Sequence, residues 1–359
     1  MADRFENGIF GMIRPEDWLQ VGYDVTRPND PTSELWGDVK TDNIVAYWES
    51  IAAEYGVPVM AQFHAFDTEA QKALRAPVDV HNIEKGLIKE KIDQSERLRA
   101  LVNRGVNRTS ELYERVLRDG YNLAEHVFTR AIVAKNEVMY SGKMTIKENN
   151  LDVTIDYGVP VGNLAKTLDF GAGASAPLDE QLLALTEEAT NAGVPIDTLY
   201  TGSADFSKLR KDANIQKAIN GASMVGILVQ DADLRAYLNE EYGINRVILQ
   251  DGVYSKPYTM GANGRPVTSS QRMFLSGKYA FMHTGGGKVG DGLWGDPPEV
   301  SAAKFMDVSG SEVSPYVFIS QYAENDPAVT WTKASALFVP VLYNPNALYV
   351  ATAANTPGT

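Results

Sequence analysis

The feature of the sequence that most constrains its fold is a run of about thirty residues, from Thr109 to Gly142, whose spacing predicts one continuous amphipathic helix. Thr109 or Ser110 can cap its start, and Gly142 can end it. Gly120 is its weak point, because a glycine inside a helix costs about 1 kcal/mol relative to alanine. A helix of about thirty residues is about 45 Å long, so the remaining elements must be arranged around it. Its apolar face consists of Leu112, Val116, Ala124, Val127, Phe128, Ala131, Ile132, Val138 and Met139.

A β-hairpin is predicted directly after this helix. Residues 144–147 alternate between apolar and polar side chains, and so do residues 151–157. Between the two runs lies Asn149-Asn150, a pair that suits a tight hairpin turn.

After a linker rich in glycine and alanine at residues 171–177, the pattern predicts a compact lobe of alternating helices and strands. Met224–Val229 is apolar almost throughout, so we expect a strand buried on both faces. The expected helices are Asp179–Ala192, Asp205–Ile219 with Ser203 as its cap, and Asp233–Tyr242. The other expected strands are Asp197–Thr201, Val247–Leu249 and Tyr279–His283.

The C-terminal part of the chain is predicted to return to β-structure. The expected strands are Tyr316–Ile319, Ala336–Tyr343 and Ala347–Val350. Pro340 lies inside the second of these, which indicates an edge strand or a bulge, because proline donates no backbone hydrogen bond.

The N-terminal third has weaker periodicity and an uneven distribution of charge. The first forty residues show no sustained period, so we expect an extended arm whose aromatic side chains need another surface. Residues 67–107 are polar and basic, and are predicted to form a long excursion that ends in a helix near Ser95–Leu101. Residues 1–60 carry eleven acids and four bases, whereas residues 72–108 carry nine bases and five acids. Two solvated surfaces explain this pattern, and so do two surfaces that dock on each other.

Composition excludes several classes of function. The chain of 359 residues contains no cysteine, which excludes disulfides and thiolate metal sites. Its net charge of -13 argues against a surface that grips nucleic acid. The charged N-terminus and the lack of a long apolar run predict neither a signal peptide nor a membrane span, so we expect the chain to remain in the cytoplasm.

The most conspicuous candidate for chemistry is the glycine-rich segment Thr284–Gly292, but it does not satisfy the requirements of a phosphate-binding loop. Val289 follows Lys288 where a P-loop needs Ser or Thr, and the prolines at 297 and 298 argue against a helix there. We expect a flexible loop. The acid pairs Asp231 with Asp233 and Glu187 with Glu188 suit helix starts and solvated faces. We therefore predict no catalytic, cofactor-binding or metal-binding residues, and none in particular among the scattered histidines His64, His81, His126 and His283.

The order of these parts resembles the major capsid proteins of tailed bacteriophages, in particular the lambda-type major capsid protein E family. The segment Tyr140-Ser141-Gly142-Lys143 leads from the long helix into the hairpin, and the hairpin closes on Asp156-Tyr157-Gly158, as in that family. Met273–Leu275, Tyr279–Phe281 and the closing run Phe338–Val350 are similar to the family's late strands in order and spacing.

This resemblance implies an α+β Hong Kong 97-like fold and a structural role without cofactors. It divides the chain into an N-arm (1–45), an extended loop region (46–108), a peripheral domain with the spine helix and hairpin (109–177), an axial domain (178–300) and a return to the peripheral domain (301–359). The implied function is a self-assembling icosahedral shell of pentamers and hexamers around double-stranded DNA, built in the bacterial cytoplasm with scaffolding and portal proteins. A tail-tube subunit and a soluble α/β enzyme remain alternatives.

Overall fold

The computed structural model describes residues 30–51, 78–94, 109–171, 176–221, 226–256, 259–260, 266–267, 269–302, 309–313, 316–325 and 328–355. The predicted helix near Ser95–Leu101 lies outside these residues. Among the helices in the described ranges, none is long and apolar enough to cross a membrane.

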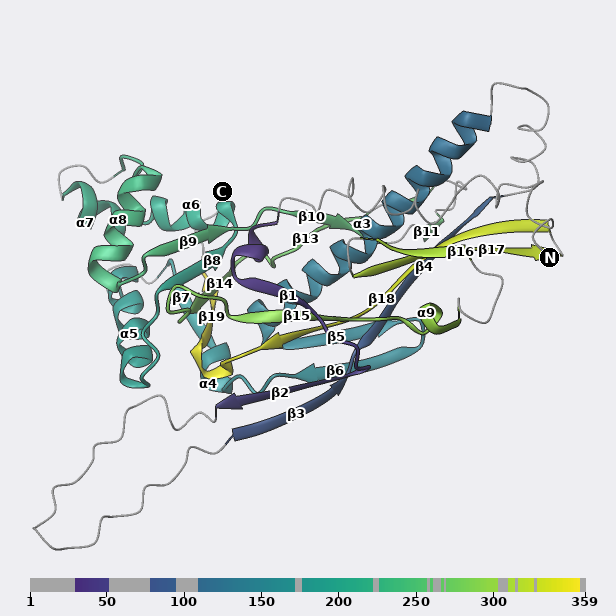
Figure 1. The fold of residues 1–359 in the computed structure, drawn as a ribbon. Coiled ribbons are helices and arrows are strands. Elements are labelled where there is room, and N and C mark those ends of the chain that lie inside the picture. The colour runs from purple at the N-terminus through teal and green to yellow at the C-terminus, as the bar shows by residue number, and fades with distance from the viewer. Residues whose placement is uncertain are drawn as a thin grey trace, which may run out of the picture.

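The long helix is confirmed as α3 (Thr109–Ser141), which continues through Gly120 (Figure 1). It ends where Gly142 adopts a φ of 67° and donates its backbone N–H to the carbonyl of Val138 at 2.8 Å. The hairpin follows as β5 (Lys143–Glu148) and β6 (Leu151–Asp156). Asn149 and Asn150 turn it, with φ values of 49° and 65°, as a type I′ turn requires.

The buried face of α3 packs on a six-stranded sheet. Phe128 of α3 contacts Trp294 edge-on, with the ring centroids 5.6 Å apart, and Trp294 lies 4.6 Å from Phe338. Helix and sheet therefore share one hydrophobic core. The strands are β1 (Trp36–Lys40), β4 (Gly86–Gln94), β15 (Gly290–Gly295), β16 (Ser309–Val313), β17 (Val317–Asn325) and β18 (Ala328–Leu342).

Strand β18 is the axis of this sheet. β4 pairs along Thr330–Phe338, whereas β17 pairs along 328–335 and β15 along 337–342. Because β4 overlaps both of the others, it occupies one edge of β18, while β17 and β15 follow each other along the opposite edge. Past Phe338 no strand of the described ranges pairs with the β4 side of β18, and there the carbonyl of Pro340 accepts a hydrogen bond from the Tyr157 hydroxyl at 2.7 Å. The expected edge strand is therefore wrong for β18 as a whole, which pairs on both sides along Thr330–Phe338, and Pro340 is tolerated because it lies beyond that stretch.

A second core lies around a five-stranded sheet of order β7-β19-β14-β8-β9 and four helices. Figure 1 shows these helices gathered at the end of the molecule away from the N-terminal end of α3. The strands are β7 (Lys166–Asp169), β8 (Thr198–Thr201), β9 (Arg246–Leu249), β14 (Lys278–Met282) and β19 (Leu348–Ala354). The helices are α5 (Leu178–Asn191), α6 (Ser203–Lys211), α7 (Ala213–Asn220) and α8 (Asp231–Tyr242).

Short elements complete the fold. They are the ribbon of β2 (Val45–Ile51) and β3 (Val78–Glu84), the pairs β10 (Val253–Ser255) with β13 (Ser270–Arg272) and β11 (Thr259–Met260) with β12 (Pro266–Val267), the helices α4 (Val161–Leu164) and α9 (Pro298–Ala302), and the 3-10 turns η3 (Pro31–Glu34) and η7 (Pro345–Ala347).

The buried strand predicted at Met224–Val229 is wrong in its described part. Residues 226–229 form no strand, and the side chains of Ile227 and Leu228 are 56% and 50% exposed. Gly226, with a φ of 100°, turns the chain. This segment could not lie next to β8 in the five-stranded sheet either, because β8 already pairs with β14 on one side and with β9 on the other.

The helix predicted at Asp205–Ile219 is divided into α6 and α7. Asp212 is extended, with a φ of -65° and a ψ of 133°, and its carboxylate accepts the backbone N–H groups of Asn214 and Ile215. An aspartate that caps a new helix in this way ends the preceding one. Ser203 is the first helical residue, and Gly202 is the N-cap.

The N-terminal expectations need two corrections. Leu35 and Trp36 are almost completely buried in the core of their own chain, and β1 is an edge strand of the six-stranded sheet. Residues 30–40 therefore need no neighbouring subunit, whereas residues 1–29 lie outside the described part. The basic excursion contains β3 and β4, of which β4 pairs with nine residues of the core strand β18.

Residues 290–295 and 348–354 do not follow the expected division into an axial domain at 178–300 and a return to the peripheral domain at 301–359. β15 follows the glycine-rich segment and belongs to the six-stranded sheet, whereas the closing strand β19 belongs to the five-stranded sheet. Each sheet therefore contains strands from both halves of the chain, and the chain crosses between them more than once.

Close packing rather than flexibility explains the glycines of β15. A Cβ atom on Gly290 would lie 2.0 Å from the Val341 carbonyl oxygen and 2.8 Å from the Trp36 ring. We predict that Gly290→Ala lowers the free energy of unfolding of the unassembled chain by about 1–3 kcal/mol, because the strand or the ring must move. Chemical denaturation measures this loss.

Gly162→Ala is the matched control, because no atom lies within 4 Å of its Cβ position. Its effect should stay within about 0.5 kcal/mol. Equal stabilities of the two variants would contradict the packing role assigned to Gly290.

Candidate functional site

The glycine-rich segment binds an anion, but that anion is a carboxylate of the same chain. The backbone N–H of Thr284 lies 2.9 Å from Oδ2 of Asp197, and the N–H of Gly285 lies 2.6 Å from the same oxygen. Burial raises the pKa of Asp197, but hydrogen bonds from Thr198, Thr284 and Gly285 outweigh it and hold that pKa below its usual value. The expectation of a flexible loop is therefore wrong at its start, which Asp197 fixes, and at its end, which is β15.

The structure does not bring the described histidines together. Nδ1 of His126, on α3, lies 2.8 Å from a carboxylate oxygen of Glu90, whose hydrogen bond raises the pKa of the imidazole despite burial. Nδ1 of His283 lies 2.6 Å from the carbonyl oxygen of Pro195. His64 lies outside the described residues, and so does the side chain of His81.

The acid pairs have ordinary partners. Asp231 bridges Arg235 at 2.9 Å across one turn of α8, and Glu188 bridges Lys166 at 2.5 Å. Within the described ranges, no group of three or more His, Asp or Glu side chains could hold a metal ion.

A buried polar network joins α3 to the five-stranded sheet. The hydroxyl of Tyr200, on β8, donates to Oδ1 of Asn136 on α3 at 2.9 Å and lies 3.1 Å from the hydroxyl of Thr32. Gln250 donates to Thr32 Oγ1 at 3.2 Å and to Asp30 Oδ1 at 2.8 Å. Tyr200, Asn136 and Thr32 are fully buried, so these bonds are shielded from competing water. The network fixes residues 30–32 between the long helix and the five-stranded sheet.

Two buried lysines fix the N-terminal strand to the six-stranded sheet. Nζ of Lys135, on α3, lies 2.8 Å from Oδ1 of Asp38, which also accepts the Trp294 indole N–H at 2.7 Å. Nζ of Lys85 donates to the carbonyl oxygens of Thr41, Asn43 and Trp294 at 2.6–3.0 Å. Burial lowers the pKa of Lys85, although Asp296 and Asp42 oppose the effect.

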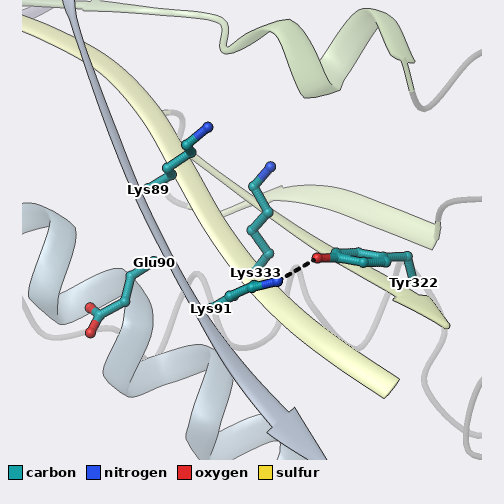
Figure 2. A pocket seen from close by; sticks show the side chains of 5 residues that line it. All are labelled: Lys89, Glu90, Lys91, Tyr322 and Lys333. Carbon is teal, nitrogen blue, oxygen red and sulfur yellow. Dashed lines mark hydrogen bonds between the residues drawn. The ribbon is translucent and has the colours of Figure 1, made fainter. Parts of the chain in front are cut away.

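A hollow of about 330 Å³ lies on the six-stranded sheet, where β4, β18 and β17 meet. Its lining residues are Lys89, Glu90, Lys91, Tyr322 and Lys333 (Figure 2). The side chain of Glu90 points toward α3 and away from the three lysines. The three ammonium groups therefore make the hollow cationic.

Comparison with known proteins identifies the family of this chain. The model of the family described as phage major capsid protein E matches residues 121–353, which is more than half of the chain. This chain belongs to that family. It is a major capsid protein, and membership of a capsid family implies that its copies assemble with one another in a virion capsid.

Solved structures with which this chain can be superposed include two proteins whose descriptions name a capsid. A prophage protein from Escherichia coli CFT073 to which a capsid role has been assigned is 12% identical, with a TM-score of 0.50 over 77% of this chain and 80% of that chain. The mature capsid of bacteriophage PhiM1 is 11% identical, with a TM-score of 0.46 over 92% of this chain and 89% of that chain. At such identities the likeness concerns the fold, and the expected Hong Kong 97-like capsid fold is confirmed. A search of curated proteins found no match.

Sequence reasoning missed the residues that hold this capsid protein together internally. Lys135 and Asn136 follow Ile132 on the apolar face of α3, and polar side chains on such a face are the signal that a buried partner exists. The partners themselves, Asp38 and Tyr200, are far away in sequence and could not be identified from it.

We predict that Lys135→Met lowers the free energy of unfolding of the capsid protein subunit by about 3–5 kcal/mol, because it leaves Asp38 buried without its cation. The Asp38 side chain is 18% exposed and the Lys135 side chain 6% exposed. The double variant Asp38→Asn with Lys135→Met should recover part of the loss. Lys147→Met, which breaks an exposed pair with Asp152, is the control and should change stability by less than about 0.5 kcal/mol.

A second prediction concerns the pH dependence of the Asp197 site. Its folded-state pKa lies below the unfolded value, so its stabilising effect is present above the unfolded pKa and is lost as the pH falls through the folded pKa. Asp197→Asn should therefore destabilise the capsid protein at pH 7 and reduce the loss of stability on acidification. Urea unfolding at pH 7 and near pH 3, below the ordinary aspartate pKa of about 3.9, tests this, and parallel pH profiles for the variant and the wild type would contradict it.

Proposed function

We propose that this capsid protein forms the icosahedral wall of a tailed-phage head that encloses double-stranded DNA, and that it works by shape alone, without catalysis. The observation that carries the proposal is the match to phage major capsid protein E over residues 121–353. The fold suits a wall, because α3 and the five-stranded sheet are tied into one subunit by the buried network at Tyr200.

The parts of the chain receive roles within this proposal. α3, the β5–β6 hairpin and the six-stranded sheet form the peripheral domain, and the five-stranded sheet with α5 to α8 forms the axial domain, which gathers at five-fold and six-fold axes. The ribbon of β2 and β3 belongs to neither sheet, and it begins the extended loop that lies over a neighbouring subunit. The N-arm of this proposal is residues 1–45, of which the structure describes the part from Asp30 onward.

The remaining parts of the proposal concern partners. Assembly takes place in the host cytoplasm, with a scaffolding protein and a portal protein. The net charge of -13 keeps packaged DNA from adhering to the wall. A tail-tube subunit is disfavoured, because a helix of 33 residues does not suit a thin β-rich tube.

Electron microscopy of the purified protein, alone and with its scaffolding protein, tests the proposed function. Closed icosahedral shells are the expected result. Open tubes, or a chain that stays monomeric under both conditions, would refute it.

The extended-loop assignment predicts that removal of residues 52–77 stops shell formation and leaves the subunit folded. Ile51 and Val78 face each other in the β2–β3 register, so an Asn-Gly turn can join them. A deletion that reached residue 90 would remove β3 and part of β4 and damage the core sheet. Thermal unfolding should stay within a few degrees of the wild type.

The control for this deletion is a glycine-serine linker of the same length in place of residues 52–77, which preserves the reach of the loop but not its side chains. Both variants should fold and fail to form shells. Shells at normal yield from either variant would contradict the role assigned to the loop.

A further inference from the structure

The hollow between β4, β17 and β18 brings three lysine side chains close together, which does not stabilise the sheet. Lys91 and Lys333 are direct partners in the antiparallel register of β4 and β18. Like charges directly opposite each other destabilise a sheet. Lys89 lies on the same side of β4 as Lys91, two residues away, so three ammonium groups share one face (Figure 2).

Only one of the three lysines forms a salt bridge with a carboxylate in the described part of the chain, and that carboxylate, Glu299, also attracts Lys89 electrostatically. Lys333 forms a short salt bridge with Glu299 of α9, and both side chains are about four-fifths buried. Lys89 and Lys91 form no salt bridge with any carboxylate in the described ranges. Glu90 is the nearest acid in sequence, but it is bound to His126 on the opposite face of β4.

The position of Lys91 is nevertheless fixed. Its Nζ lies 3.8 Å from the centroid of the Trp331 ring and 3.4 Å from the Tyr322 hydroxyl oxygen. Tyr322 accepts this bond, so its own hydroxyl proton is free to be donated. The hollow therefore presents ammonium and hydroxyl donors, and a ligand that satisfies them must be an acceptor with negative charge.

We propose that Lys89, Lys91 and Tyr322 form a receptor site for a carboxylate side chain of a second copy of this chain. Charge complementarity favours this occupant, because each copy carries 46 acids and 33 bases and therefore presents an excess of carboxylates. DNA is a poorer fit, since a phosphate backbone is held by a row of cations and only two lysines here lack a salt bridge. The proposal rests on the self-assembly included in the proposed function.

The first test compares assembly of the wild-type chain with that of Lys89→Gln/Lys91→Gln. Lys333 is left unchanged because it holds Glu299. The matched control is Lys143→Gln/Lys147→Gln, which removes the same charge from exposed lysines that already have partners within the chain, Asp156 and Asp152. The site variant should need about tenfold more protein to assemble, equivalent to the loss of about 1.4 kcal/mol per contact. Its assembly should also depend less on salt than that of the wild type.

The second test detects the contact itself. A zero-length carbodiimide joins a lysine amine to a carboxylate only when the two are in contact. In assemblies made from mixed ¹⁴N and ¹⁵N copies, mass spectrometry distinguishes links between copies from links within one. Lys89 and Lys91 should form links between copies, whereas Lys143 should link to Asp156 within one copy.

The outcomes separate this site from the proposed function. Wild-type shells with no intermolecular link at Lys89 or Lys91, or equal assembly of the site variant and the control, would overturn the site and leave the shell intact. If duplex DNA binds the wild type and not the site variant while assembly is unchanged, the ligand is a phosphate and the proposal is wrong. A wild-type chain that never assembles overturns both the function and the site.

Discussion

The burial of one face of α3 beneath strand β18 is the interaction on which the rest of this capsid protein depends. A helix of 33 residues cannot be stable in water with an apolar face exposed, and a strand of 15 residues is long enough to cover much of it. Once β18 is in place, its two edges determine where β4, β15 and β17 pair, and β1 and β16 extend the sheet from them. Aromatic side chains close the centre of this contact, where Phe128 from the helix and Phe338 from the strand both contact Trp294.

The second core is joined to the first by polar contacts as well as by packing. Tyr200 lies on β8 of the five-stranded sheet and Asn136 lies on α3, and Thr32 bonds to both, so three distant parts of the chain meet at one buried group of hydroxyl and amide side chains. Such a group is stable only when every member is satisfied, which restricts the relative positions of the two cores. The same logic holds at Asp38, which accepts both the Lys135 ammonium group and the Trp294 indole.

Local pattern was sufficient for the elements that carry their own periodicity. The spacing of apolar residues predicted α3, α5 and α8, and the asparagine pair predicted the β5–β6 turn. The prediction failed where the structure of a segment depends on contacts with residues far away in the sequence. The sequence around residues 226–229 does not reveal that β8 already has a neighbouring strand on each side. The sequence around Leu35 does not reveal that Trp36 pairs with Gly290 of β15. The glycines of β15 were assigned to flexibility, although the nearby Val341 carbonyl and Trp36 ring leave room only for a hydrogen atom at Gly290. The lysine-lined hollow could not be foreseen either, because its members come from three strands.

The position of Asp197 in the glycine-rich turn has a consequence for how such sequences evolve. Two backbone N–H groups of this turn, those of Thr284 and Gly285, are already bonded to a carboxylate from a neighbouring strand end, so the chain supplies its own anion. Exchange of that aspartate for a small neutral residue would remove the acceptor of both amide donors. One substitution therefore separates a turn that is filled from within the chain from a turn with two unfilled amide donors.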